Sequence, residues 1–308
     1  MDDNKLKKNI CDLYLKILER EPDEEGLEYF LNNIKQNIMT ISDIEKSIKN
    51  SSEFNSRNKL HLKNSPNFQS LFSDLEIQKL LNSSDSWYHY YKFNNIETHQ
   101  TRTSLDYQMW AAQGIPQNLE TKSVLDIGAF DGFFSFLCEY RNAKRVLAID
   151  NEEHDDNTKT ITPTSSNFEI CKKILDSKVE YKKMNVYDID KLDGTFDIIL
   201  LFGVYYHLDN LITAIQKIFT KVNDTLYLTG HILETDEPLL YYYDTSKYDP
   251  DGFSRVVASP QCLINIGKTM GFKTVELLDT LDLGKSKKYP HMIFSEPHLK
   301  VGTFKFSK

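Results

Sequence analysis

Residues 123–150 read SVLDIGAFDGFFSFLCEYRNAKRVLAID, and the rest of the chain can be organised around them. A short apolar run, residues 124–127, ends at a glycine turn, and the apolar segment 133–140 follows with the length of a helix. A second apolar run, residues 146–149, stops at an acid. Strand, glycine turn, helix and acid-ended strand in this order are typical of the first half of a nucleotide-binding α/β unit.

The glycine turn indicates which nucleotide is bound. A dinucleotide site needs G-x-G-x-x-G, whereas this turn has Gly128 and Gly132 with Asp131 directly before the second glycine. The acid would repel a phosphate and suits a ligand whose ammonium needs an acceptor, which favours S-adenosylmethionine. Asp150 ends the second strand, where it can accept hydrogen bonds from ribose hydroxyls. The candidate cofactor residues here are Asp126, Gly128, Ala129, Phe130, Asp131, Gly132, Asp150 and Asn151.

The same stretch resembles motif I of the class I methyltransferases, usually written (D/E)-x-G-x-G-x-G. This chain departs from that pattern at Phe130, where the middle glycine is expected, so its loop is bulkier. The resemblance implies an α/β fold of the class I methyltransferase (Rossmann-like) type, with a seven-stranded sheet and S-adenosylmethionine as cofactor. In that family an acid after the third strand meets the exocyclic amine of adenine, which implies this role for Asp188. Whether the branched apolar residue after it, Ile189, also contacts the cofactor is left open.

The fourth strand is predicted from residues 196–203, FDIILLFG. This nearly continuous apolar run is of the kind that parallel sheets bury on both faces. Open α/β sheets bind ligands at the carboxyl ends of their strands. Phe202, Gly203 and Tyr206 are therefore further cofactor candidates.

Two histidines are the candidate catalytic bases. His207 follows the fourth strand and His231 follows a fifth strand, residues 225–229, so both are expected at the same edge of the sheet. Methyl transfer to a hydroxyl needs a base, and histidine titrates near neutrality. Glu234 is expected to orient or assist one of them. In an alternative interpretation the three residues hold a divalent metal that binds a diol, although their spacing is unspecific.

Two segments resemble a narrower family, related to the enzymes that carboxymethylate the wobble uridine of tRNA. One is the order WYH…R…D…W, starting at Trp87, ahead of VLDIGAFDGFFSF, and the other is FDxxxxxGVxYH, ending at His207. Those relatives carry basic residues directly after this histidine, whereas residues 208–210 here read LDN. The sequence therefore favours ordinary S-adenosylmethionine over a carboxylated cofactor.

Aromatic residues gather in two places that we expect to shape the acceptor pocket. Residues 87–93 read WYHYYKF and form either a lid over ligand and acceptor or plain core, and the resemblance favours the lid. The segment 232–260, inserted between the fifth strand and the next helix, is expected to overhang the ligand edge. The candidate substrate-binding residues are Trp87, His89, Arg102, Tyr242 and Arg255.

Residues 4–60 show helical periodicity and little strand signal. They resemble a small helical domain found in bacterial glycan-modifying and secreted proteins, whose signature includes GREPD, a glycine and SPEF. The matching residues are EREPD at 19–23, Gly26, Tyr29 and SEF at 52–54, with departures at Glu19 and Ser52. We expect this module to serve docking or oligomerisation.

Composition limits the partners. A net charge of −8 argues against a phosphate backbone as the main partner, and no apolar run approaches the roughly 20 residues that span a bilayer. The four cysteines have neither CxxC spacing nor the density of a disulfide framework, so we expect no metal site and a bacterial cytoplasmic protein. The expected organisation is a helical module at 1–60, a linker and aromatic lid at 61–118, and a methyltransferase domain at 119–308, with late strands at 292–294 and at an extra sheet edge after Pro297.

The leading hypothesis is an O-methyltransferase that acts on a sugar or glycan hydroxyl in surface-polysaccharide biosynthesis. The helical module and the aromatic insert motivate it, because aromatic rings stack on sugar faces. Two alternatives stay open. One is a tRNA-modifying methyltransferase, which rests on the family resemblance, and the other is a non-catalytic scaffold whose Phe130 loop no longer admits cofactor.

Overall fold

The computed structural model describes residues 3–18, 20–36, 38–49, 51, 60–151, 164–242, 254–281 and 299–308. The chain divides into two compact units, Met1–Asn64 and Ser65–Lys308. Where the sequence predicted a linker and lid at 61–118, residues from Ser65 onward belong to the second unit. Three predictions lie outside the described residues: the SEF segment at 52–54, the middle of the insert at 243–253, and the strand at 292–294.

In its described residues, the first unit packs three α-helices around one apolar core. Its apolar residues recur at helical spacing, so each helix turns one face inward. The predicted helical N-terminal region is confirmed. The helices are α1 (Asp3–Leu18), α2 (Glu24–Lys35) and α3 (Ile41–Lys49), followed by the 3-10 helix η1 (Leu60–Asn64).

The EREPD signature builds the turn between α1 and α2. Asp23 caps α2, because its Oδ1 accepts the backbone N–H of Gly26 at 2.7 Å. The Tyr14 hydroxyl packs close to Gly26, because a Cβ at this position would lie only 2.9 Å from the hydroxyl oxygen. The Arg20 guanidinium lies 5.4 Å from the centre of the Tyr14 ring and 3.7 Å from Asp23. Helix capping and close packing therefore explain this part of the signature.

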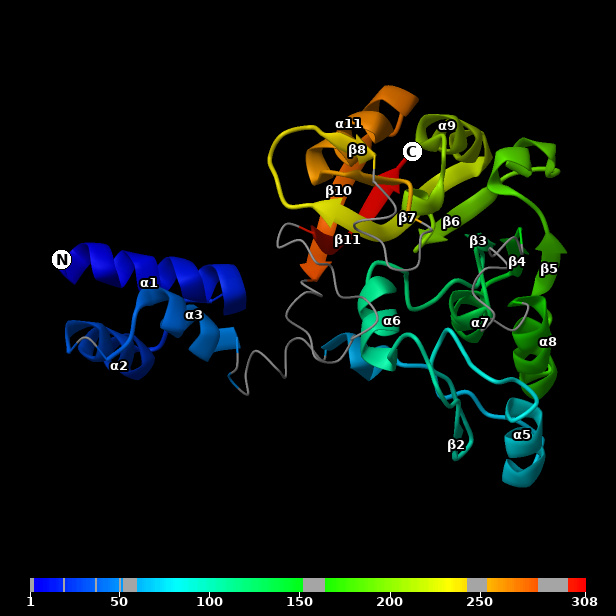
Figure 1. The fold of residues 1–308 in the computed structure, drawn as a ribbon, viewed down its shortest axis with the longest axis horizontal. Coiled ribbons are helices and arrows are strands. Elements are labelled where there is room, and N and C mark those ends of the chain that lie inside the picture. The colour runs from blue at the N-terminus through cyan, green and yellow to red at the C-terminus, as the bar shows by residue number, and fades with distance from the viewer. Residues whose placement is uncertain are drawn as a thin grey trace. The chain divides into compact units, whose positions relative to one another are not determined.

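The second unit is built on one mixed sheet, whose main path has the strand order β10-β11-β7-β6-β3-β4-β5 (Figure 1). Neighbouring strands from β7 to β5 run parallel, and β11 runs antiparallel to both of its neighbours. The predicted class I methyltransferase fold is confirmed. The strands are β3 (Ser123–Ile127), β4 (Arg145–Asp150), β5 (Glu180–Lys183), β6 (Phe196–Phe202), β7 (Val222–Leu233), β10 (Thr274–Leu281) and β11 (Leu299–Ser307).

The last strand lies inside the sheet, where the sequence predicted an extra edge strand after Pro297. β11 is hydrogen-bonded to β7 on one side, with Thr303 opposite Thr229, and to β10 on the other. Its residues Phe304 and Phe306 are 0% and 1% exposed. An interior position gives these rings cover and leaves neither edge of the strand unpaired, which is the physical reason for the correction.

Helices cover both faces of the sheet. In Figure 1, α9 and α11 lie toward one face, and α7 and α8 toward the other. None of the helices in the described part of the chain is long and apolar enough to cross a membrane. The helices are α5 (Asp74–Leu81), α6 (Leu105–Ala111), α7 (Phe133–Tyr140), α8 (Thr164–Leu175), α9 (Leu211–Lys221) and α11 (Pro260–Met270), with the 3-10 helices η2 (Val186–Lys191) and η3 (Tyr205–His207).

An extended segment ahead of the sheet packs on α7. Phe68 forms an isolated β-bridge with Phe93, and its ring lies 6.1 Å from that of Phe133 in α7. These rings bury one side of the segment, so it is part of the core and not a solvated linker. The short hairpin next to it is made of β1 (Lys92–Phe93) and β2 (Ile96–Glu97).

The fifth strand is longer than predicted. β7 runs past Thr229 to Leu233, because residues 230–233 pair with residues 299–302 of β11. His231 therefore lies within the strand and not after it. Beyond it, β8 (Leu240–Tyr242) and β9 (Val256–Ala258) pair with each other, and β9 also pairs with β7.

Candidate functional site

The glycine loop, residues 128–132, connects β3 to α7 at the carboxyl edge of the parallel strands. Gly128 has φ +72° and Gly132 has φ +89°, in the left-handed region that favours glycine. A Cβ at Gly128 would lie 2.4 Å from Cγ2 of Val204, which follows β6. The loops after β3 and β6 therefore touch, and this contact brings two predicted parts of the cofactor site together.

Phe130 keeps the backbone conformation of the glycine that motif I has at this place. Its φ is +55°, a conformation that costs a residue with a side chain about 1–2 kcal/mol. Its N–H donates to Oδ2 of Asp150 at 3.0 Å, and its ring centre lies 4.5 Å from that of Tyr88. The bulkier loop therefore has the glycine-type backbone, and these two contacts hold it.

Two buried acids lie on neighbouring strands below this loop. Asp126 of β3 and Asp150 of β4 are 1% and 4% exposed. Ser135 Oγ donates to Asp126 Oδ2 at 2.6 Å. Burial raises the pKa of Asp126 to about 6, against the opposing effects of that hydrogen bond and of the His89 charge. The Asp126 carboxyl therefore titrates close to neutral pH.

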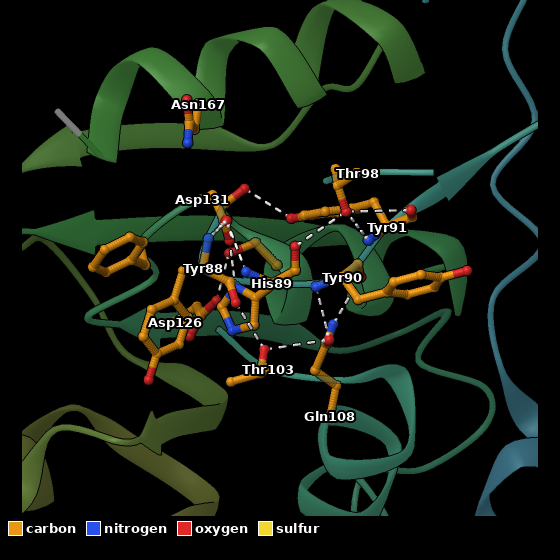
Figure 2. Close-up of polar contacts among 12 residues, drawn as sticks. Tyr88, His89, Tyr90, Tyr91, Thr98, Thr103, Gln108, Asp126, Asp131 and Asn167 are labelled. Carbon is orange, nitrogen blue, oxygen red and sulfur yellow. Dashed lines mark hydrogen bonds and ion pairs between the residues drawn. The ribbon is translucent and has the colours of Figure 1, made fainter. Parts of the chain in front are cut away.

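Asp131 ties the glycine loop to residues 87–103, which we call the strap (Figure 2). Its Oδ2 accepts the backbone N–H groups of Tyr88 and His89 at 2.9 Å each, and its Oδ1 pairs with His89 Nδ1. Tyr91 donates its hydroxyl to the main-chain oxygen of Asp131 at 2.8 Å. The structure thus corrects the expectation that Asp131 accepts a cofactor ammonium, because the strap occupies both carboxylate oxygens of this buried side chain.

The strap is largely core. Trp87 is 1% exposed, and the Tyr91 ring stacks on Phe93 at 5.2 Å. Buried Gln108 of α6 accepts the N–H of Tyr90 at 2.9 Å and donates to its carbonyl at 3.0 Å. The structure places the Trp87 indole in the core, where it has no exposed face to stack on an acceptor, so it gives the predicted substrate contact no support. Sequence alone gives no signal that separates a buried indole from an exposed one.

Arg102 lies near the end of the strap with a half-buried side chain. Its backbone N–H is shared between the carbonyls of Trp87 and Tyr88, at 3.1 Å each. Among the described residues, no carboxylate forms an ion pair with its guanidinium. Its role in binding substrate stays a prediction.

The carboxyl end of β6 supplies three of the cofactor candidates. Phe202 is 8% exposed, and Gly203 has φ +72°. A Cβ at Gly203 would meet nothing nearer than the Tyr206 hydroxyl at 3.5 Å, so the backbone here borders open space. Since Val204 of the same loop contacts Gly128, these residues lie beside the glycine loop.

The two predicted bases lie against one tyrosine. The Tyr206 ring stacks on His231 at 3.9 Å with an interplanar angle of 7°, and lies 4.3 Å from the ring of His207. Tyr205 donates its hydroxyl to the main-chain oxygen of His231. The predicted proximity of the two histidines is thus present, although no sequence pattern indicated that Tyr206 would join them.

Glu234 does not take the predicted position beside a histidine. Its carboxylate pairs with Lys300 of β11, a residue that the sequence reasoning missed because β11 was expected at the edge. Within the described ranges, no group of three or more His, Cys, Asp or Glu side chains could hold a metal ion. The alternative in which His207, His231 and Glu234 bind a divalent metal therefore has no support in this arrangement.

The insert places two substrate candidates near η3. The Arg255 N–H donates to the carbonyl of Tyr206 at 2.6 Å, and its Nε lies 3.3 Å from Asp209. Tyr242, on β8, is 61% exposed, and the adjacent Tyr241 is 47% exposed. This side of the sheet edge therefore presents an arginine and exposed aromatic rings.

Three further cofactor candidates occupy the expected strand ends. Asp188 lies in η2 after β5 and forms an ion pair with Lys191 at 2.6 Å. Asn151 directly follows β4 and is half-buried, while Ala129 of the glycine loop is 2% exposed. Their contacts with a cofactor stay predictions.

Position 189, which the sequence left open as a cofactor contact, belongs to the core. The Ile189 side chain is 0% exposed and packs in the apolar core of the second unit together with Val186 and Leu192. Its carbonyl accepts the N–H of Leu192 at 3.0 Å. The structure therefore corrects this candidate, because a fully buried aliphatic side chain anchors η2 and offers no surface to a cofactor.

Comparison with protein families gives two matches. Residues 106–277 match the family described as a methyltransferase domain, and residues 5–58 match a domain of unknown function, DUF4214. The first match covers more than half of the chain and includes the glycine loop, β6 and both histidines. The second covers the three helices of the first unit.

Similar proteins fall into two groups. The chain is 25% identical over 237 residues to a tRNA U34 carboxymethyltransferase of Nautilia profundicola, and 24% identical over 180 residues to that of Campylobacter concisus. These alignments cover 75% and 56% of this chain, and 66% and 57% of the relatives. Among solved structures, the N-terminal domain of EvdMO1 with SAH bound has a TM-score of 0.55 at 15% identity, over 77% of this chain and 97% of that one. The same domain in the presence of SAH and D-fucose gives 0.54 at 17% identity.

Proposed function

Because this chain belongs to the methyltransferase-domain family, we propose that it transfers a methyl group from S-adenosylmethionine to a hydroxyl of a sugar or glycan. One observation carries the proposal: the loops after β3 and β6 meet at one sheet edge, with buried Asp150 beside them and exposed aromatic residues beyond. The two loops and Asp150 fit a nucleoside-bearing donor, and the exposed aromatic residues fit a polar acceptor with flat faces.

The donor fits the edge formed by β3, β4 and β6. Gly203 leaves open space at a positive φ, which lets a ligand approach the backbone closely. Asp150 ends β4, where it can accept ribose hydroxyls, and Asp188 follows β5, where it can accept the adenine amine. When bound, S-adenosylmethionine supplies a methyl group on a sulfonium, a leaving group that needs no covalent help from the protein.

The acceptor fits the region of η3, β8 and β9. Tyr241 and Tyr242 expose rings on which a sugar face can stack, and Arg255 carries a charge beside them. His207 is exposed next to Tyr206, where it can contact an acceptor hydroxyl. Support for a sugar also comes from EvdMO1, whose similar domain was crystallised in the presence of D-fucose.

We extend the proposal to surface-polysaccharide biosynthesis because the helical first unit resembles a domain found in bacterial glycan-modifying proteins. We expect this unit to dock or oligomerise the enzyme, since its described residues form a compact core of their own.

Calorimetric titration with S-adenosylhomocysteine, followed by transfer of radiolabelled methyl to a panel of free sugars and sugar nucleotides, tests the proposal. We expect saturable binding and label in a sugar product. The matched control is Gly203→Val, which fills the open space beside the Tyr206 hydroxyl and should abolish binding. A chain that binds no S-adenosylhomocysteine would contradict the proposal and favour the scaffold.

A tRNA-modifying enzyme is the second candidate, favoured by the 25% identity to a tRNA U34 carboxymethyltransferase. The net charge of −8 and the segment LDN after His207 oppose it, because a phosphate backbone needs basic contacts. Filter binding to tRNA at moderate salt separates the two. Tight, salt-sensitive retention together with methylated tRNA would replace the sugar proposal.

A further inference from the structure

His89 and Asp131 form a buried pair between the strap and the glycine loop. The exposed fractions of their side chains are 6% and 0%. Nδ1 of the ring faces one carboxylate oxygen, while the other oxygen accepts the N–H groups of Tyr88 and His89 at 2.9 Å (Figure 2). The carboxylate is therefore fixed relative to the ring, as the acid is in an acid–histidine pair of a hydrolytic triad.

This pairing sets the tautomer of His89. A carboxylate accepts a hydrogen bond from Nδ1–H, so the neutral ring carries its hydrogen on Nδ1 and its lone pair on Nε2. Nε2 lies across the ring and faces away from Asp131. No hydrogen bond among the described residues uses Nε2. The ring thus offers a basic lone pair on the side opposite its carboxylate.

The ring lies where donor and acceptor would meet. It packs edge-on against Phe134 at 5.3 Å, and Phe134 packs against Phe202, the last residue of β6, at 4.8 Å. The neighbouring Tyr88 contacts both the His89 ring and Phe130 of the glycine loop. His89 is therefore held between the ends of β3 and β6, at the point where strand order reverses about β3 and where open α/β sheets bind ligands.

The acid that the sequence assigned to orient a base is engaged elsewhere. Glu234 pairs with Lys300, so it does not complete a pair with His207 or His231. The orienting geometry expected at those histidines is found at His89 instead.

Resting on the proposed function, we propose that His89 is the general base of the methyl transfer and that Asp131 is the residue that positions it. The acceptor hydroxyl gives its proton to Nε2 of His89 while its oxygen forms the bond to the methyl carbon. The methyl–sulfur bond breaks, and its electron pair stays on sulfur, so the sulfonium becomes a neutral thioether. The resulting imidazolium is stabilised by the Asp131 carboxylate and returns its proton to water.

The charged and titratable groups around the ring suit this step. Asp131 faces Nδ1, and the charge of Asp126 interacts with that of the ring from β3. Tyr91 donates to the main chain of Asp131, and burial keeps its pKa well above the usual value, so it stays neutral. α7 contributes the apolar rings of Phe133 and Phe134. The Asp131 carboxylate lies against Nδ1, where its negative charge stabilises the imidazolium as it forms.

The test compares His89→Gln and Asp131→Asn with His99→Gln, the same histidine change elsewhere in the strap. Using the panel sugar with the highest turnover, we expect kcat of the first two variants to fall at least about 100-fold. Their affinity for S-adenosylhomocysteine should stay within about threefold of the wild type, and the limb of the kcat–pH profile that reports the base should disappear. The His99→Gln variant should keep all three properties.

Two kinetic outcomes overturn the inference. An unchanged kcat in His89→Gln would show that His89 is not the general base, and the proposed function would still stand. If both variants lost thermal stability and affinity for S-adenosylhomocysteine together, the pair would have only a structural role, holding the strap against the glycine loop. If no sugar accepts a methyl group from the wild type, the proposed function itself fails, which is a distinguishable result.

A measurement on the folded wild type keeps the test independent of the variants. In 15N-histidine NMR of the S-adenosylhomocysteine complex, the signal missing from His89→Gln should show hydrogen on Nδ1 and a lone pair on Nε2. In Asp131→Asn the amide nitrogen would face Nδ1, so the hydrogen should move to Nε2. Hydrogen on Nε2 in the wild type would overturn the assignment.

Discussion

The two halves of the sheet edge differ in how their polar groups are held. At the strap, the glycine loop and the adjoining α6, the whole residues His89, Gln108 and Asp131 are at most 4% exposed, and each makes hydrogen bonds inside the protein. At β8 and η3, Tyr242 is 61% exposed and Arg255 forms a partly exposed ion pair. The first half is fixed before any ligand arrives, whereas the second can adapt. Under the proposed function, the fixed half would hold the methyl donor and the adaptable half would receive the acceptor.

This difference also sets the energetic scale of changes. Removing one partner of a buried hydrogen bond leaves the other unsatisfied and costs about 1–3 kcal/mol. An exposed ion pair contributes about 0–1 kcal/mol. Substitutions in the first half should therefore lower the free energy of unfolding more than those in the second, where we expect the main effect to be on the acceptor.

The largest effect is expected at the contact between the loops after β3 and β6. Gly128→Ala places a Cβ 2.4 Å from Val204 Cγ2, which forces the loops apart and should cost about 1–3 kcal/mol beyond backbone strain. Chemical denaturation measures the loss, and calorimetry should find no binding of S-adenosylhomocysteine. Gly194→Ala is the matched control, because its φ is +71° against +72° and a Cβ there has no atom within 4 Å. Equal effects of the two changes would show that the loop contact is unimportant.

An intermediate effect is expected from the buried acid of β3. Burial raises the folded-state pKa of Asp126 to about 6, so its contribution to stability is full below its usual pKa and is lost as pH rises through 6. That loss amounts to about 2–3 kcal/mol. Asp126→Asn should remove this pH dependence and be more stable than the wild type at pH 7.5, measured by urea unfolding without ligand.

The control for this prediction is Asp197, whose pKa is shifted in the opposite direction from that of Asp126. Although burial opposes it, hydrogen bonds from Ser123 hold the pKa of Asp197 below its usual value. Its contribution is therefore present above the usual carboxyl pKa and lost as pH falls. Asp197→Asn should destabilise the protein at pH 7.5. A stability curve of Asp126→Asn that still falls between pH 4 and 6.5 like the wild type would contradict the assignment.

The smallest effect on folding is expected in the acceptor half. Tyr242→Ala removes an exposed ring and should change the free energy of unfolding by less than about 0.5 kcal/mol. We expect KM for the sugar acceptor to rise about threefold to tenfold at constant kcat, because loss of ring stacking weakens binding by about 1 kcal/mol. Steady-state kinetics measures this, with Leu239→Ala as a control at another exposed apolar residue. If Tyr242→Ala also lowered the affinity for S-adenosylhomocysteine, the two halves of the sheet edge would not act as separate donor and acceptor regions.

Local patterns predicted much of the site. The acid-ended β4, the glycine loop and the end of β6 each follow from a short stretch of sequence, because parallel strands place their carboxyl ends at one edge. Phe130 was recognised as a departure from the glycine pattern, and its φ of +55° explains why a glycine is usual there. These features depend on neighbours in the chain.

Contacts between distant segments were not predictable in the same way. Asp131 meets a strap more than 40 positions earlier in the chain, and no local pattern tells whether such an acid faces a ligand or a backbone. Likewise, β11 extends β7 by pairing with residues 230–233 and supplies Lys300 to Glu234. Both outcomes depend on which strand edges and faces remain open once the rest has folded.

The order of β3 to β7 and of the helices between them, the glycine loop and the acids that end the strands could be predicted from the amino-acid order, because hydrophobic period and turn chemistry act over a few residues. Only the tertiary structure decides that Trp87 and Ile189 are buried in the core. It also decides that the Tyr206 ring packs against His207 and His231. It was also needed for Asp131 to orient His89. Burial and pairing depend on the surfaces that distant segments present to one another, so they cannot be read from the identity of a single side chain.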